Sequence, residues 1–244
     1  MKIIFGYMPN NEQSCLERDE FVIECNKHQI NYVLFENYDH VNFEEVYNKE
    51  NTRRTELDNG QKGPGGAGTA SNFASMISIW RLIVELNETC AVFEHDARPV
   101  TNPSGVTVKD DEIVLLGPRV PTLDYYTYPE NIENINYIEV KNHAGGHAYA
   151  ITPNTAKKMI EHVEKMGVCD SFDQWFFMRI KQYHVGNFLD LKLMACDPPV
   201  AVCVNRREGQ IKKSTRNYKN EDQAEYNFYK TPGFKKGLNN ERST

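Results

Sequence analysis

The stretch KIIFGYMPNNEQSCLERDEFVIECNKHQINYVLF, residues 2–35, decides the fold class of this chain. Residues 2–8 form an apolar run of strand length, which predicts a buried strand. Ser14, followed three residues later by Glu17, has the spacing of a capping box and predicts a helix that runs to about residue 28. Residues 30–35 predict a second strand. The order strand, helix, strand indicates an α/β fold with a parallel sheet and helices on its faces.

Length and composition limit the classes of protein that the chain can belong to. It has 244 residues, of which 40% are hydrophobic and 25% charged, and this suits a globular protein with a full core. Its net charge of −6 argues against binding of nucleic acid by the whole surface, although a local basic patch stays open. The six cysteines form no CxxC pair and favour buried free thiols in a reducing compartment.

The ends of the chain and its apolar runs bear on localisation and domain organisation. Neither a signal peptide nor a run of about 20 apolar residues is recognisable, so we expect a cytoplasmic protein with no integral membrane segment. We expect a single domain over residues 1–218. Residues 219–244 contain few aliphatic side chains and predict a polar tail that is loosely packed or disordered. The oligomeric state is unknown from the sequence.

A second stretch, AVFEHDA at residues 91–97, contains the most informative candidate site. Its apolar start predicts a buried strand that runs into Glu94 and Asp96. Side chains alternate along an extended strand, so both carboxylates are expected on one side and His95 on the other. Two converging carboxylates repel each other unless a positive charge lies between them, and a divalent cation is the natural candidate. The alternative is a solvated acidic turn.

Two further segments lie near the same predicted edge of the sheet. Tyr7 ends the first strand, and ligands of such sheets bind at the carboxyl ends of the strands. Residues 62–69 form a glycine-rich loop before an amphipathic helix expected over residues 70–87. This loop can present backbone N–H groups to phosphates, but it lacks the Gly-Lys-Ser/Thr ending of a Walker loop, and a plain surface loop fits equally well. Trp80, inside the helix, is interpreted as a core residue.

Charged residues late in the chain supply other candidate groups. Asp170 and Asp173 open a predicted helix, where one of them can act as a general base or simply cap the helix. Three histidines (His143, His147 and His184) are candidate ligands or bases, or structural hydrogen-bonding residues. A basic segment over residues 206–219 includes Arg206, Arg207 and Lys213, and it can neutralise a diphosphate, contact a polyanion or remain solvated.

Together these groups predict transfer of a chemical group from an activated donor. A carboxylate pair, a divalent metal and nearby cations are what a nucleotide diphosphate needs, because the metal stabilises the leaving diphosphate as its bond breaks. A further carboxylate, Asp170 or Asp173, can deprotonate an acceptor hydroxyl.

Four motifs occur in an order that resembles a known family. They are GPGGAGTASNFASMISIWRLIVELNETCAVFEHDA (63–97), DEIVLLG (111–117), GGHAYAITPNTAKKMI (145–160) and DSFDQWFF (170–177). The set resembles glycosyltransferase family 25, which contains lipooligosaccharide glycosyltransferases and collagen galactosyltransferases. Members carry a glycine-rich turn, a helix with Ser-His and Trp, a strand ending in Glu-Asp-Asp, and a late Asp. The resemblance covers about residues 63–216.

The resemblance implies a fold, a cofactor and roles for individual residues. The implied fold is of the GT-A type, a nucleotide-sugar-binding α/β fold with a mixed, mostly parallel sheet flanked by helices, here as one catalytic domain. The implied cofactor is Mn²⁺, or Mg²⁺ in its place, and the implied reaction inverts the anomeric carbon. Glu94 and Asp96 match the outer acids of the family's metal and donor motif, and Asp173 best matches the late Asp.

The chain also departs from the family's pattern at three positions. His95 replaces the middle acid, Met76 stands where the family has the His of Ser-His, and Thr69 stands where Glu is common. The metal set expected from this motif is therefore Glu94, Asp96 and His95, with Tyr7 and the basic residues of segment 206–219 also contacting the donor.

We therefore expect a hexosyl- or pentosyltransferase that uses a nucleotide-sugar donor. The acceptor is either a glycan, as in lipopolysaccharide biosynthesis, or a hydroxymethylated base, as in DNA modification. The small size and the Asn-, Lys- and Tyr-rich composition fit a viral member acting in the host cytoplasm, for which the second acceptor applies. The competing hypothesis is a non-catalytic, glycosyltransferase-like binding protein.

Overall fold

The computed structural model describes five segments of the chain and six single residues outside them. These are residues 1–38, 67–117, 134–140, 146–168 and 189–203, with Glu45, Tyr47, Asn48, Ile132, Phe172 and Phe176. The expected boundary between a domain over 1–218 and a tail over 219–244 lies outside the described residues. No helix among the described residues is long and apolar enough to cross a membrane.

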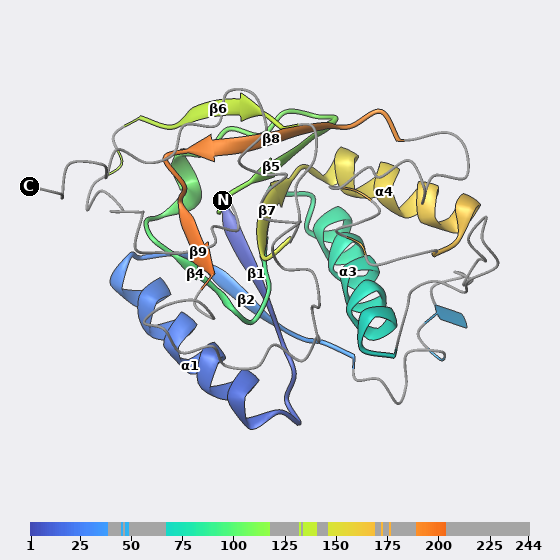
Figure 1. Ribbon diagram of the computed structural model, residues 1–244, viewed down its shortest axis with the longest axis horizontal. Helices are drawn as coiled ribbons and strands as arrows, with labels where there is room; N and C mark the ends of the chain where they lie inside the picture. Colours follow the sequence, from blue (N-terminus) through green and yellow to red (C-terminus); the bar gives the residue numbers. More distant parts are fainter. Residues whose placement is uncertain are drawn as a thin grey trace, which may run out of the picture.

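A mixed, partly parallel sheet of seven strands forms the centre of the molecule, in the order β2-β1-β3-β7-β5-β8-β6 (Figure 1). Five strands run in one direction and two in the other, because β7 is antiparallel to both of its neighbours and β6 is antiparallel to β8. The five are β1 (Lys2–Tyr7), β2 (Tyr32–Glu36), β3 (Cys90–Phe93), β5 (Glu112–Leu115) and β8 (Lys192–Asp197); the two are β7 (Ala148–Ile151) and β6 (Asn136–Glu139).

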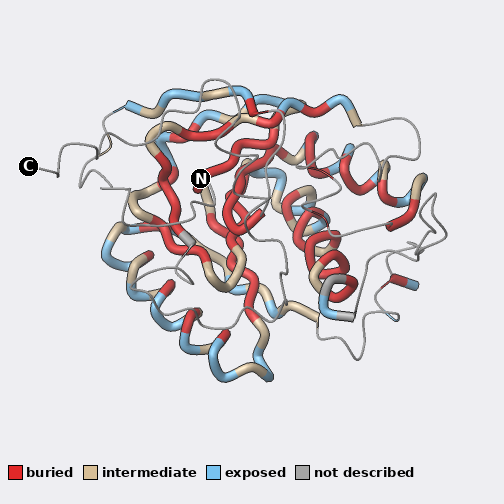
Figure 2. Tube along the Cα trace, in the orientation of Figure 1, coloured by how far each residue is buried: buried red, intermediate tan, exposed pale blue. Residues whose placement is uncertain are grey.

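Three long helices cover the two faces of this sheet. α1 (Glu12–Lys27) packs on one face, where it meets Ile3 and Phe5 of β1, and the Phe5 and Phe21 rings stack with centroids 4.0 Å apart. α3 (Ala67–Leu86) and α4 (Pro153–Met166) pack side by side on the other face. Figure 2 shows the central strands buried between these layers. The α/β layering expected from residues 2–35 is therefore confirmed.

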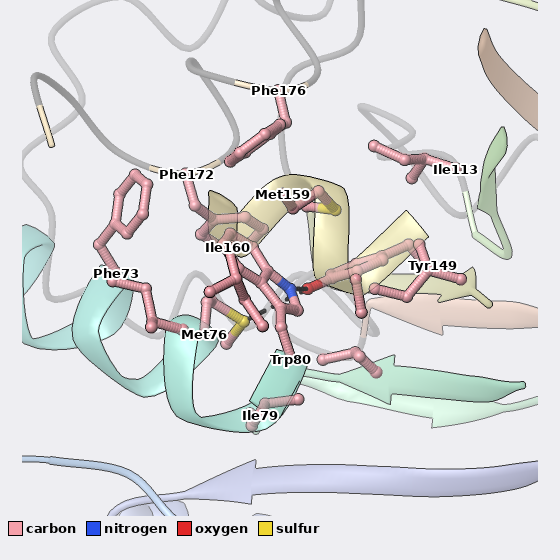
Figure 3. Packing of buried hydrophobic residues seen from close by; sticks show 14 of the residues in the cluster. Phe73, Met76, Ile79, Trp80, Ile113, Tyr149, Met159, Ile160, Phe172 and Phe176 are labelled. Carbon is pink, nitrogen blue, oxygen red and sulfur yellow. Dashed lines mark hydrogen bonds between the residues drawn. The ribbon is translucent and has the colours of Figure 1, made fainter. Parts of the chain in front are cut away.

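The core beneath α3 and α4 is organised around Trp80, which is fully buried as expected (Figure 3). Its indole Nε1 donates to the Tyr149 hydroxyl at 2.8 Å, and that hydroxyl lies 3.5 Å from the Met76 sulfur. Tyr149 comes from β7, so this hydrogen bond joins a helix to the central strand of the sheet. It also satisfies the one polar atom of a large indole that packing has removed from water.

The helix ends follow local capping rules, and one predicted cap, at Ser14, is wrong. Thr152 caps α4, Pro153 takes its first position, and Gly167 follows its last turn at φ 78°, as predicted. The predicted capping box at Ser14 is wrong in register. Asn11 is the N-cap of α1 and accepts from the Ser14 N–H at 2.9 Å, while the Ser14 hydroxyl accepts from the Met8 N–H.

Three short elements were not predicted. β6 pairs antiparallel with β8 at the edge of the sheet. β4 (Ala97–Pro99) pairs antiparallel with β9 (Ala201–Cys203) in a separate two-stranded sheet. A 3₁₀ turn, η1, covers Pro103–Gly105. β4 and β6 form because they pair with strands that lie far away in the sequence, so the local pattern of residues does not predict them.

Candidate functional site

The candidate site is the turn Glu94–His95–Asp96 at the carboxyl end of β3. β3 ends at Phe93, and the Ala97 N–H donates to the Glu94 carbonyl at 2.9 Å, which closes a tight turn into β4. The expectation that an extended strand runs through Glu94 and Asp96 is therefore wrong, so strand alternation does not decide on which side these side chains lie. All three are half-buried.

Backbone hydrogen bonds attach this turn to the sheet. The Glu94 N–H donates to the His147 carbonyl at 2.8 Å, just before β7. Of the three candidate histidines, His147 is the one that lies among the described residues, and its backbone holds the turn. Since β1 and β2 run parallel to β3, their carboxyl ends meet at the same edge of the sheet. The turn thus occupies the edge at which α/β sheets bind ligands.

Asn72, from the second turn of α3, contacts the Glu94 side chain. Its Nδ2 donates to Glu94 Oε1 at 2.9 Å. This bond fixes one carboxylate oxygen of the turn and also fixes which way the amide faces, since the opposite orientation would bring two oxygens together. The Asn72 Oδ1 atom is buried and makes no hydrogen bond to any residue that the structure describes. Sequence reasoning missed Asn72.

The ends of β1 and β2 contribute a second group of polar side chains. The Tyr7 hydroxyl donates to Glu36 Oε1 at 3.0 Å, and the Arg18 guanidinium lies 5.0 Å from the centre of the Tyr7 ring. Asn37 lies over Gly6, where a Cβ would come within 2.6 Å of its Oδ1. Only glycine fits at position 6 without displacing this amide, so Gly6 allows the Asn37 side chain to lie against β1.

Residue 38 connects this group to the helix that carries Asn72. The Tyr38 N–H donates to the Ser75 hydroxyl at 3.0 Å, and Ser75 follows Asn72 by one turn of α3. The Ser78 hydroxyl lies 3.4 Å from the Tyr38 hydroxyl. The end of β2, the start of α3 and the turn after β3 are thus linked by hydrogen bonds into one polar edge.

Charge and burial modify the ionisation of several groups, some at this edge and some elsewhere in the core. Hydrogen bonds with Asp19 and then Tyr7 raise the pKa of Arg18, so the guanidinium stays charged. Burial raises the pKa of Tyr149, and the negative charge of Glu94 adds to it, so the hydroxyl stays protonated in the core beside Trp80. Burial also raises the pKa of Cys25 to about 12 and that of Cys90 to about 11. Neither thiol is therefore suited to act as a thiolate nucleophile.

Most of the other predicted site residues lie outside the described residues. They are Asp170, Asp173, Arg206, Arg207 and Lys213, together with His143, His184 and the glycine-rich segment 62–66. The described part of this region ends at Cys203, which lies opposite Ala97 in the β4–β9 ladder. The chain therefore leaves β9 beside the acidic turn, three residues before Arg206.

The described residues test whether a protein cage could hold the implied metal. They contain no group of three or more His, Cys, Asp or Glu side chains arranged to bind an ion, so Glu94, His95 and Asp96 do not form such a group. The carboxylates of the turn do suit Mn²⁺ or Mg²⁺ in another arrangement. Hard divalent ions at phosphate sites take one or two carboxylates from the protein and complete their shell with phosphate oxygens and water.

Sequence comparison adds no family assignment to this geometry. Neither the protein-family models nor the curated proteins include a match to this chain.

Proposed function

We propose that this protein is a glycosyltransferase that moves a hexosyl or pentosyl group from a nucleotide-diphosphate sugar to a hydroxyl acceptor. The observation that carries the proposal is the place of the Glu94–Asp96 turn, at the carboxyl ends of three adjacent parallel strands. The strand order, with the antiparallel β7 inserted between β3 and β5, supports a fold of the GT-A type. The motif order over residues 63–216 supports the same class.

In the proposed complex, each part of the edge has a separate role. Tyr7, Glu36 and Asn37 offer an aromatic face, a carboxylate and an amide to the nucleoside, next to the ends of β1 and β2. Glu94 and Asp96 would hold Mn²⁺ or Mg²⁺ on the diphosphate side of the donor. A bound ion of this kind supplies electrostatic stabilisation of the leaving diphosphate. Arg206, Arg207 and Lys213 add positive charge to the same leaving group.

The proposed reaction is a direct displacement with inversion. Asp173, or Asp170 as second choice, removes the proton of the acceptor hydroxyl, whose oxygen attacks the anomeric carbon from the side opposite the diphosphate. The bond between that carbon and the diphosphate oxygen breaks, and the diphosphate leaves with its electron pair. Asn72 keeps Glu94 oriented during this step through its 2.9 Å hydrogen bond.

A thermal-shift panel of nucleotide sugars, with and without Mn²⁺, tests the donor class. A ligand at about 100 times its Kd stabilises the native state by about 2.7 kcal/mol, which is readily measured. We expect one nucleotide series to raise the melting temperature in the presence of Mn²⁺ and to do so far less in the Asp96→Ala variant. If no nucleotide sugar binds, the transferase proposal fails. If one binds and is neither transferred nor hydrolysed, the chain is a binding protein of the same fold.

A DNA-binding assay separates the two acceptor classes. A hydroxymethylated-DNA acceptor predicts a salt-dependent gel shift that is lost when Arg206 and Arg207 are both changed to Ala, because each phosphate contact releases counterions. A glycan acceptor predicts no shift with either protein.

A further inference from the structure

Arg98 is a buried cation next to the acidic turn, and no step proposed above uses it. Its side chain is 2% exposed, and that of its ion-pair partner Glu17, on α1, is 7% exposed. A buried charge is costly unless it is paired and its remaining donors find acceptors, and a buried ion pair often contributes no more stability than well-packed apolar residues. The position of this pair therefore calls for a reason other than overall stability.

The remaining donors of Arg98 point into the turn. Its Nη1 donates to the His95 carbonyl at 3.1 Å and to the Ala97 carbonyl at 2.8 Å, while its Nη2 contacts Glu17 Oε2 and lies 3.4 Å from Glu20 Oε2. His95 is the central residue of the turn, so its carbonyl cannot find a partner in a strand ladder. One planar guanidinium thus joins the backbone of the turn to two acids of α1.

Glu17 is itself held in place on α1. Its other oxygen, Oε1, accepts from Gln13 Nε2 at 2.6 Å, one helical turn earlier. α1 begins at Glu12, a short turn after β1 ends at Tyr7. The chain of contacts from Gln13 to Glu17 to Arg98 to His95 therefore connects the first turns of α1 with the loop that carries Glu94 and Asp96.

We propose that Arg98 is a positioning residue that sets the conformation of the Glu94–Asp96 turn, and hence the aim of its carboxylates at the diphosphate of the donor. This inference rests on the proposed function for the identity of the ligand. The clamp, by which we mean the contacts of Arg98 with the His95 and Ala97 carbonyls and with Glu17, is given by the structure itself. Only arginine suits this role. Its planar guanidinium can donate to the His95 and Ala97 carbonyls and to Glu17 at the same time, whereas the lysine ammonium is a single point charge.

Amide hydrogen exchange of the full-length Arg98→Lys variant tests the clamp without any ligand. Lysine can keep the ion pair with Glu17 but cannot also bond both carbonyls. We expect exchange at the Ala97 amide, which closes the turn, to accelerate about tenfold, because hydrogen bonds to charged groups carry that much energy. The Leu116 amide, which bonds to the Ala148 carbonyl at 3.0 Å within the sheet, should be unchanged.

Arg81→Lys is the matched control. Arg81 pairs with Glu164 at 2.9 Å between α3 and α4, on the opposite face of the sheet. The Arg81→Lys variant should leave the exchange of the Ala97 and Leu116 amides at the wild-type rate.

Gln13→Ala, a change at an exposed position, covers the case in which Arg98→Lys does not fold. It should accelerate exchange at the Ala97 amide about two- to threefold, because Glu17 loses the hydrogen bond from Gln13. Unchanged Ala97 exchange in the folded variants, or equal acceleration at Leu116, overturns the clamp.

Titration with Mn²⁺ and inorganic pyrophosphate, followed by water-proton relaxation, tests what the clamp is for. Pyrophosphate is the part that all nucleotide-diphosphate donors share. We expect Arg98→Lys to weaken Mn²⁺-pyrophosphate binding about tenfold and Arg81→Lys to leave it unchanged. Equal binding by Arg98→Lys and wild type, with faster Ala97 exchange, overturns the positioning role. If wild-type protein binds no Mn²⁺-pyrophosphate and no nucleotide sugar, the proposed function fails, and the exchange measurement alone decides the clamp.

In a transfer assay, a positioning role and a merely structural one separate by their kinetic parameters. A displaced turn raises the KM of the donor and the Mn²⁺ requirement and leaves the KM of the acceptor unchanged. A structural lesion instead lowers the active fraction, so kcat falls and neither KM moves. The second pattern overturns the proposal.

Discussion

The chain contains an acidic turn at each edge of the central sheet. Glu94–Asp96 follows β3 at the carboxyl edge, whereas Asp110 and Asp111 precede β5 at the opposite edge. Asp110 accepts from the Thr152 hydroxyl at 2.6 Å through one oxygen and from Asn154 Nδ2 at 2.8 Å through the other. Asp111 forms an ion pair with Lys158. The protein uses these carboxylates itself, to attach the start of α4 to the sheet.

The turn at Glu94–Asp96 is attached to other elements. Its backbone is held through the Glu94 N–H, the Ala97 N–H and the His95 carbonyl. The backbone of the Asp110–Asp111 turn is held too, because the Lys192 N–H donates to the Asp111 carbonyl at 2.8 Å and the Asp111 N–H donates to the Thr155 hydroxyl at 3.1 Å. The two turns differ in what their carboxylates contact: Asp110 and Asp111 contact α4, whereas Glu94 contacts the Asn72 amide of α3. The place of the Glu94–Asp96 turn at the carboxyl edge, rather than the presence of two acids, distinguishes the candidate site from the structural turn.

Removing one carboxylate from each turn gives the largest expected contrast. Asp96→Asn should lower sugar transfer at least ~100-fold, because charge stabilisation at a reacting diphosphate is usually worth that much. Asp110→Asn should leave transfer near the wild-type rate. Initial rates at saturating Mn²⁺ measure both variants. Equal activity of the two would remove the distinction between the turns and the site assignment with it.

Asn72→Ala tests the Glu94–Asp96 turn through its contact with α3. The variant loses the hydrogen bond to Glu94 Oε1, a bond to a charged group, so donor affinity should fall about tenfold. Isothermal titration with the nucleotide identified by the panel measures it. Asn154→Ala is the matched control, because it removes the corresponding amide from Asp110 and should leave donor affinity as it is.

Thr152→Ala tests the structural turn. The variant removes both the N-cap of α4 and a hydrogen bond to Asp110, so the free energy of unfolding should fall by about 1–2 kcal/mol. For a chain of this size that corresponds to a drop of roughly 2–8 °C in Tm. Calorimetry measures it, and donor affinity should not change. A stability equal to that of wild type would show that this acidic turn does not anchor α4.

The smallest expected effect is a dependence of stability on pH. Hydrogen bonds from Thr152 and then Asn154 hold the pKa of Asp110 below its usual range. Because the folded pKa lies below the unfolded one, this contribution is present above about pH 4 and is lost as the pH falls through the folded pKa. Urea unfolding at pH 6 and pH 3 should show a smaller loss of stability in Asp110→Asn than in wild type. An identical loss in both proteins contradicts this account.

Prediction from the sequence was most successful where neighbouring residues decide the outcome. The strand at residues 2–8, the long helix with Trp80 facing the core, and the caps of α4 at Thr152 and Gly167 all depend on groups within a few positions in the chain. The error at Ser14 is of the same local kind. Asn11 is also a good N-cap residue, and the choice between them depended on where β1 ended.

The candidate site was only partly predictable. Tyr7 at the end of a strand and the acids at 94 and 96 could be identified from spacing, and both do lie at the carboxyl edge. Asn72 and Arg98 could not be identified, because no residue near them in sequence signals their partners at positions 94 and 17. An arginine between Ala97 and Pro99 has no local feature that predicts burial.

By itself, the sequence determined the layered α/β class and the candidate acids, because periodicity, capping and residue chemistry act over one or two turns of chain. The tertiary structure alone decided that Glu94–Asp96 is a turn rather than the end of a strand. It also decided that β7 enters the sheet antiparallel and that Arg98 is buried against Glu17. These features depend on contacts between residues as many as 81 positions apart, and their energy exists only when the chain is folded.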